Sequence, residues 1–345
     1  MTMKKINTLL SAAFLLACTA LNAQEISFER FQGNPIIHEG LLPPLEGDNI
    51  NGPTLIKVPD WVMNKLGKYY LYFAHHKGKY IRLAYADKLE GSWKIYEPGT
   101  LKVEDCICKD APVGTGESVR HQGAETSDDN VQHVASPDIF IDNARKELVL
   151  YYHCPLEYQG KKSQYSLSAV SKDGLRFKAD NVVLGESYFR VFRWNDYFYA
   201  IGRSSAVYRS KDGRTAFEKG PNPFLKVQNP SLLRHSAVKL VGNTAWVFYS
   251  RVGDEPERIL LSKIDLTNDW NNWTPTPPVT VAEPKEEYEG ANLPIEKSKL
   301  GLFYGKVRQL RDPYVYEENG KWYLLYSTAG EHGIGIGELK VNKGS

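Results

Sequence analysis

Short apolar or alternating runs follow one another along most of the chain, separated by turns rich in Gly, Asp and Asn. This pattern predicts β-strands joined by tight connections. Five segments repeat one motif, in which a short strand and a turn lead to an aromatic-rich strand. The paired runs are 53–56 with 68–73, 137–140 with 147–152, 189–192 with 197–201, 236–239 with 245–249, and 313–316 with 321–326.

A third strand follows each pair, and in four units it leads through a turn to Trp93, Phe177, Phe217 or Trp273. Two of these turns contain the sequence Ser-Lys-Asp-Gly, which ends at Gly174 and at Gly213. Asp-Gly between strands is a strong hairpin signal, since both residues of such a turn need positive φ. Four antiparallel strands per unit, repeated radially, predict an all-β, five-bladed β-propeller.

The fifth unit stops after Gly335–Leu339 and lacks an outer strand. Residues 26–31 alternate in polarity, and we expect them to supply that strand and close the ring. No amphipathic helix is longer than a turn or two, so the chain from 24 to 345 is predicted to be one propeller domain. Two long connections, 101–133 and 274–310, join neighbouring units, and long loops on a β-scaffold often form functional walls.

The N-terminus has the pattern of a secretory signal peptide. Lys4 and Lys5 precede the apolar run 6–21, and a small-residue site predicts cleavage after Ala23. An alternative is a lipoprotein anchor at Cys18, because the residues before it resemble a lipobox. Either interpretation predicts export, to the periplasm or the outside of the cell, and the run is too short for a transmembrane helix.

The charge of the chain argues against several classes of partner. The 43 basic and 41 acidic residues give a formal net charge of +2, and cleavage of the leader removes two lysines, which leaves no net charge. Nucleic-acid binding normally requires a basic excess or stripe, so this class is not expected. Three cysteines remain after cleavage at Ala23, and we expect one disulfide or buried thiols among Cys106, Cys108 and Cys154.

At these repeats the sequence resembles the five-bladed propeller glycosidases, which include glycoside hydrolase families 43, 32 and 117. In those families the residue before the Pro of each innermost strand points into the central channel, and the best match here is Arg311-Asp312-Pro313 in the fifth unit. In family 43 the first three blades supply a base Asp, an Asp that adjusts pKa values and an acid Glu. The corresponding positions here are Gly52, Ser136 and roughly Ser187, so these acids are not carried over.

Other acids lie close to those positions. Asp138 shares a strand face with Ser136, because side chains alternate along a strand, and Glu186 lies one residue before the third position. Glycoside hydrolysis needs a proton donor and a base or nucleophile. We therefore expect Asp138 and Asp312 to flank the substrate, with His235 or Glu186 as the proton donor.

Charged and polar residues also occur at corresponding places in the units, at the ends of the second strands and the starts of the first. Buried charges need partners or a ligand, so such a ring is a candidate site. Arg matches carboxylate and sulfate groups, which favours a uronic or sulfated sugar. We expect the substrate to be bound by His76, His153, Arg190, Arg203, Arg251 and Arg311.

Each of these residues also has a structural interpretation. Asp138 would then bind backbone amides, Asp312 would pair with Arg311, and Arg203 and Arg251 would bridge blades. Three functions remain open: an exported glycoside hydrolase acting on oligosaccharides or polysaccharides, a polysaccharide lyase, and a non-catalytic glycan-binding propeller. No cofactor is required, although histidines and carboxylates in such channels can hold Ca²⁺ through waters.

Overall fold

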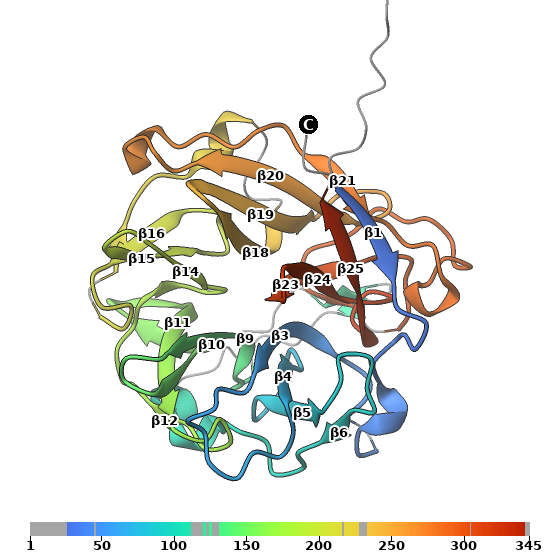
Figure 1. Cartoon of the computed structure of the whole chain (residues 1–345), viewed down its shortest axis with the longest axis horizontal. Helices are drawn as coiled ribbons and strands as arrows, with labels where there is room; N and C mark the ends of the chain where they lie inside the picture. Colours follow the sequence, from blue (N-terminus) through green and yellow to red (C-terminus); the bar gives the residue numbers. More distant parts are fainter. Residues whose placement is uncertain are drawn as a thin grey trace, which may run out of the picture.

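The computed structural model describes residues 26–44, 46–111, 131–215, 217–227, 233–303 and 305–341, with the backbone of 120–121 and 124–125. Five antiparallel sheets are arranged around a central channel, as Figure 1 shows down the channel axis. The predicted five-bladed propeller is confirmed. The leader and the lipobox lie outside the described residues.

Each blade contains four antiparallel strands, and the strands β3, β9, β14, β18 and β23 lie nearest the channel. Blade 1 is built from β3 (Asn51–Lys57), β4 (Tyr69–Ala74), β5 (Arg82–Ala86) and β6 (Lys94–Ile95). Blade 2 is built from β9 (Ala135–Asp142), β10 (Glu147–Tyr158), β11 (Lys161–Ser171) and β12 (Lys178–Ala179), with β13 (Gly185–Glu186) added to β11. Blade 3 is built from β14 (Arg190–Trp194), β15 (Tyr197–Ile201), β16 (Val207–Ser210) and β17 (Glu218–Lys219). Blade 4 is built from β18 (Leu233–Val241), β19 (Thr244–Arg251), β20 (Ile259–Asp265) and β21 (Val279–Ala282). Blade 5 is built from β23 (Arg311–Glu318), β24 (Lys321–Ser327), β25 (Gly333–Val341) and β1 (Ile26–Arg30), with β2 (Ile37–His38) beside β25.

The N-terminal strand closes the ring, as the sequence predicts. β1 pairs antiparallel with β25, from Ile26 opposite Val341 to Arg30 opposite Gly337. Arg30 also forms an ion pair with the buried Glu289, with Nε 2.7 Å from a carboxylate oxygen. The outer edge of the last blade is therefore covered by the first strand of the chain.

The helical content consists of short 3₁₀ turns, and the described residues contain no α-helix. Within those residues there is also no helix long and apolar enough to span a bilayer. The 3₁₀ turns are η1 (Glu39–Leu41), η2 (Val103–Asp105), η3 (Ile107–Asp110), η5 (Pro223–Lys226), η7 (Trp270–Asn272) and η8 (Glu287–Glu289).

The hydrophobic core is divided into five clusters, one between each pair of neighbouring blades. Alternation places one face of each sheet against the preceding blade and the other against the following blade. Tyrosines reinforce this packing, since the hydroxyls of Tyr72 and Tyr151 donate to the carbonyls of Gly174 and Gly213, each at 2.8 Å. The two Ser-Lys-Asp-Gly turns are thus anchored to the preceding blade. Only their glycines have positive φ, so they are longer than two-residue hairpin turns.

The two long connections meet at one face of the propeller. β22 (Leu302–Phe303), from the connection between blades 4 and 5, pairs with β8 (Ala124–Glu125), which also pairs with β7 (Arg120–His121). A disulfide joins Cys108 to Cys154 and ties the other end of the first connection to blade 2, while Cys106 is a buried thiol.

Candidate functional site

Equivalent residues of the five blades form a ring at one mouth of the channel. In blades 1, 2, 4 and 5 the innermost strand carries an irregularity near its start. Positive φ angles mark the corresponding position in four blades, with 59° at Gly52, 53° at Ser136, 68° at Tyr188 and 50° at Asp312. The third-blade counterpart of Gly52 and Ser136 is therefore Tyr188, one residue beyond the sequence-based estimate. Register places Arg234 in the ring for blade 4.

A second ring lies two residues further along each inner strand. Asp138 accepts a hydrogen bond from the amide of Val191 at 2.8 Å, as Thr54 accepts one from the amide of Ile139. Burial raises the pKa of Asp138, and the nearby Arg190 offsets this only in part. Asp138 thus connects blade 2 to blade 3 and does not line the pocket described below.

Arg190 belongs to this second ring, and its side chain reaches the neighbouring blades. Its guanidinium donates to the backbone carbonyls of Ser136, Pro137 and Ser236, at 2.9 to 3.2 Å. The side chain is buried, with 2% of its surface exposed. Arg190 therefore joins blades 2, 3 and 4 below the mouth, and it is not among the residues that line the pocket.

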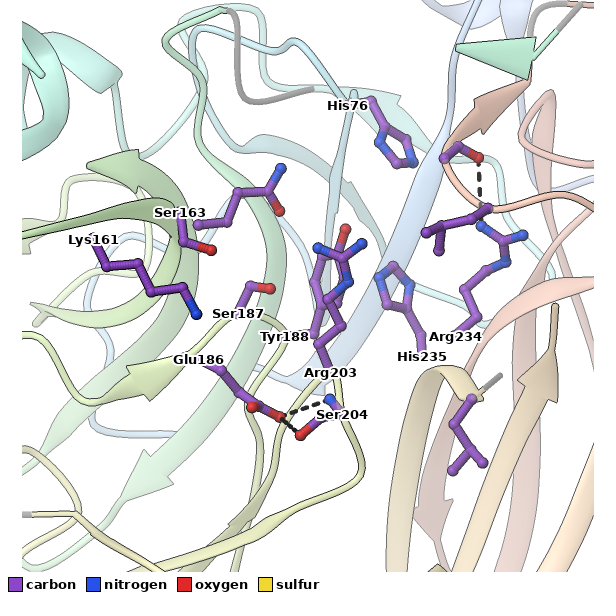
Figure 2. A pocket seen from close by; sticks show the side chains of 14 residues that line it. His76, Lys161, Ser163, Glu186, Ser187, Tyr188, Arg203, Ser204, Arg234 and His235 are labelled. Atoms are coloured by element: carbon purple, nitrogen blue, oxygen red, sulfur yellow. Dashed lines mark hydrogen bonds between the residues drawn. The ribbon is translucent and has the colours of Figure 1, made fainter. Parts of the chain in front are cut away.

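A pocket of about 400 Å³ lies above the first ring, between blades 2, 3 and 4 (Figure 2). Blade 3 supplies most of its polar centre, and the neighbouring blades and the second long connection supply the walls. The lining residues are His76, Lys161, Ser163, Gln164, Glu186, Ser187, Tyr188, Arg203, Ser204, Leu233, Arg234, His235, Leu300 and Gly301.

The centre of the pocket contains a histidine supported by a carboxylate. Nδ1 of His235 contacts Oδ1 of Asp312, and both side chains are almost fully buried. Asp312 also accepts hydrogen bonds from the amide of Gly52 and the hydroxyl of Ser327. Burial alone would raise the pKa of this carboxyl group, but the contact with His235 outweighs it and the pKa lies below its ordinary value.

Burial of His235 favours its neutral form. Burial lowers its pKa, although Asp312 acts in the opposite direction. A neutral ring that donates from Nδ1 to Asp312 leaves a lone pair on Nε2. This Nε2 atom is buried and has no hydrogen-bond partner among the described residues. The contact with Asp312 thus leaves Nε2 as the ring nitrogen of His235 that faces no protein partner among the described residues.

Tyr188 connects His235 to the remaining aromatic and cationic groups. Its ring centroid lies 4.2 Å from that of His235 and 4.6 Å from that of His153, in edge-to-face contacts. The guanidinium carbon of Arg203 lies 5.7 Å from the same centroid. Figure 2 shows Tyr188, Arg203 and His235 together at the centre of the pocket. The rings of Tyr188 and His235 and the guanidinium of Arg203 thus lie together in the lining of the pocket.

A buried ion network supports two further residues of the lining. Glu331 accepts hydrogen bonds from Arg311 at 2.8 Å and from Asn49 at 2.6 Å, and it lies 3.1 Å from Nε2 of His76. The network continues through Arg311 to Glu257, at 3.4 Å. Burial alone would raise the pKa of Glu331, but His76 and Arg311 keep it well below its ordinary value.

Glu257 extends this network to the opposite wall. It accepts hydrogen bonds from Arg234 at 2.8 and 3.2 Å and from Ser250 at 2.7 Å. The positions of His76 and Arg234 in the pocket are therefore set by one buried set of charges. Arg311 is part of that set and is fully buried, so it supports the site from below.

The remaining residues predicted from sequence are divided between the pocket and its surroundings. Glu186 lines the pocket, and its carboxylate accepts hydrogen bonds from the amide and the hydroxyl of Ser204, both at 2.6 Å. His153 lies behind Tyr188, and burial holds its pKa well below the ordinary value. Arg251 lies outside the lining and pairs with Asp254 at 3.0 Å.

Sequence reasoning missed Tyr188, Arg234, Glu257 and Glu331 as parts of the site. Tyr188 is not followed by a proline, so nothing marks the start of its strand. Glu257 and Glu331 lie in the connections between second and third strands, where His76 and Arg203 also lie. A charged or histidine residue in the connection between the second and third strands is thus the sequence feature that could have identified these site residues.

The described residues contain no group of three or more His, Cys, Asp or Glu side chains arranged to hold a metal ion. The histidines of the pocket face carboxylates or aromatic rings instead, as His235 faces Asp312 and Tyr188.

Comparison with known proteins identifies one related sequence. The chain is 35% identical over 347 residues to "Uncharacterized protein R118" of Acanthamoeba polyphaga mimivirus, and the match covers 94% of each chain. No protein-family model matches the sequence.

Solved structures with the same fold include glycoside hydrolases of family 43. A family 43 β-xylosidase/α-arabinofuranosidase from a compost metagenome is 14% identical, with a TM-score of 0.54 over 88% of this chain and 94% of that chain. An endo-1,4-β-xylanase from Bacteroides thetaiotaomicron is 13% identical, with a TM-score of 0.54 over 86% and 92%. A family 43 enzyme from Xanthomonas citri is 12% identical, with a TM-score of 0.55 over 88% and 91%. These similarities establish the shared five-bladed fold.

Proposed function

Since this chain belongs to the same family as the mimivirus R118 protein and has the fold of the family 43 glycoside hydrolases, we propose that it is an exported glycoside hydrolase acting on oligosaccharides. The observation that carries the proposal is the pair formed by His235 and Asp312 at the centre of the pocket. A neutral histidine backed by a carboxylate can accept a proton from an attacking water. The pair would take the place of the two aspartates of family 43, because Gly52 and Ser136 stand at the corresponding positions of this chain.

Hydrolysis also needs a proton donor for the departing sugar oxygen. Glu186 is the one carboxyl residue among the described residues of the lining, and it reaches the pocket from β13, which pairs with β11 of blade 2. In the proposed reaction, water attacks the anomeric carbon and gives a proton to Nε2 of His235. The glycosidic oxygen leaves with the proton of Glu186.

We further propose that the substrate carries an acidic sugar. Arg203 lines the pocket, and none of its guanidinium nitrogens has a carboxylate partner among the described residues. Arg190 and Arg251, which the sequence also favoured for this role, are occupied by backbone carbonyls and by Asp254. A planar guanidinium matches the two oxygens of a carboxylate or sulfate group.

A second function is favoured by a specific contact. The pocket presents a histidine base, the hydroxyl of Tyr188 and Arg203 within one group, whereas it offers a single carboxyl residue. In a polysaccharide lyase, an arginine neutralises the uronate, a base removes the C5 proton, and the C4–O bond breaks as the protonated base returns a proton to the leaving oxygen. This reaction requires no second carboxylate.

Product analysis on a panel of acidic oligosaccharides tests both functions. Hydrolysis adds the mass of one water to the products, whereas elimination gives an unsaturated uronide that absorbs in the ultraviolet. We expect His235→Gln to lower turnover by about 10²- to 10⁴-fold, as for a lost general base. Asp312→Asn should lower it as well and move the acid limb of the pH profile downward, because Asp312 raises the pKa of His235.

Two outcomes would contradict the proposal. Binding of glycans without any product would leave a carbohydrate-binding propeller. Full activity of a folded His235→Gln variant would place the reacting groups elsewhere.

A further inference from the structure

The hairpin between β10 and β11, the second and third strands of blade 2, is longer than the corresponding hairpins of the other blades. These two strands contain 12 and 11 residues, and they remain paired from Leu148 opposite Ser171 to Tyr158 opposite Lys161. Three residues near the tip, Lys161, Ser163 and Gln164, line the pocket. The hairpin therefore forms a wall of the pocket on the side away from His235 (Figure 2).

Gln164 points to a ligand on this side. Only 5% of its surface is exposed, and its Oε1 atom has no hydrogen-bond partner among the described residues. A buried acceptor without a donor costs free energy. A sugar hydroxyl in the pocket would supply the missing donor, and the hydroxyl of Ser163 lies in the same wall.

The charges on this side are unbalanced. Neither Lys161 nor Arg203 forms an ion pair within the described part of the chain, and both line the pocket. The only carboxylate near them in that lining, Glu186, is already bound by Ser204 and lies 3.7 Å from Lys219. Two positive groups from blades 2 and 3 thus line the pocket without a carboxylate partner of their own among the described residues.

We propose that Lys161, Ser163 and Gln164 of the hairpin, with Arg203 opposite them, form a subsite for the acid-bearing sugar of the substrate. Arg203 and Lys161 bind the carboxylate or sulfate, and Gln164 accepts a hydrogen bond from a ring hydroxyl of the same sugar. This inference rests on the proposed function, because it takes the ligand to be a glycan. It places the acid group beside the reacting centre at His235, on the blade 2 side.

Calorimetric titration of the whole protein tests the subsite without requiring turnover. The probes are digalacturonate, its dimethyl ester, which removes only the charge, and a sulfated disaccharide, which separates carboxylate from sulfate recognition. We expect one of the two acids to bind at least tenfold more tightly than the ester. Lys161→Met should remove most of this difference, and Gln164→Leu should weaken the acid and the ester equally.

Lys162→Met is the matched control. Lys162 is the next residue of the same hairpin and is not among the residues that line the pocket. It should leave all three affinities unchanged.

Equal affinity for acids and ester, or equal effects of Lys161→Met and Lys162→Met, overturns the subsite even if the protein hydrolyses glycans. Acid-selective binding that depends on Lys161, without any product, supports the subsite and contradicts the hydrolase.

Discussion

A buried carboxylate can serve chemistry or structure, and the partners of each one distinguish the two roles. Asp312 contacts a histidine whose other nitrogen belongs to the pocket. Asp138 instead binds a backbone amide of the next blade and lies below the pocket, near Arg190. The two carboxylates that the sequence placed on either side of a substrate therefore lie in different layers of the channel.

This difference leads to a prediction for Asp138. Asp138→Asn keeps an oxygen acceptor for the amide of Val191 and should leave stability nearly unchanged. Asp138→Ala leaves that buried amide without a partner, and we expect a loss of about 1–3 kcal/mol in the free energy of unfolding. Urea denaturation followed by tryptophan fluorescence measures both values. A stable Asp138→Asn variant without activity would instead return Asp138 to the catalytic role predicted from sequence.

At the scale of the elements, β1 does two things for the last blade. It pairs with β25 and so removes an exposed sheet edge, which would otherwise be free to pair with another chain. It also brings Arg30 to Glu289, a fully buried carboxylate that further accepts a hydrogen bond from Tyr326 at 2.6 Å. The second long connection is thereby fastened to the N-terminal strand.

Arg30→Met should therefore destabilise the protein, because Glu289 would keep its burial but lose its cation. We expect a loss of about 1.5–3 kcal/mol in the free energy of unfolding, the range for a charged hydrogen bond. Glu29→Gln is the control, since Glu29 is exposed and lies 3.7 Å from the half-exposed Lys340. Similar stabilities of the two variants in thermal denaturation would show that the ion pair of Arg30 contributes little.

For the molecule as a whole, buried histidines predict sensitivity to acid. Burial lowers the pKa values of His75, His153, His235 and His332, and that of His75 falls to about 4. Below about pH 6.5 these histidines bind protons in the unfolded chain but not in the folded protein. The free energy of unfolding therefore falls as the pH falls.

Each such histidine should contribute a slope of about 1.4 kcal/mol per pH unit in this window. The stabilising carboxylates Asp312 and Glu331, whose pKa values are lowered, lose their contribution only at more acidic pH. We expect His153→Gln to reduce the slope of the free energy of unfolding between pH 6.5 and 4 by the contribution of one histidine. Urea denaturation at several pH values measures this slope, and an unchanged slope would mean that His153 takes up its proton within the folded state.

The fold could be predicted because its signal repeats. Five strand pairs with the same polarity pattern specify blades, and a fifth unit short of one strand required the segment that begins at Ile26. The site is less regular, since it depends on register within the channel. A proline marks the inner strand after Gly52, Ser136 and Asp312 but not after Tyr188, and so the third position was misplaced by one residue.

The partners of the charges could not be predicted for a related reason. Arg203 and Arg251 both lie at the ends of second strands in the sequence pattern. In the structure Arg203 lines the pocket, whereas Arg251 pairs with Asp254. Such choices depend on side-chain geometry between blades, which a linear pattern does not contain.

The guanidinium of Arg190 also has a consequence for the cohesion of the ring. It binds backbone carbonyls of blades 2 and 4, so that one side chain links the inner strands of three blades. Loss of this side chain would therefore remove three contacts between blades at once.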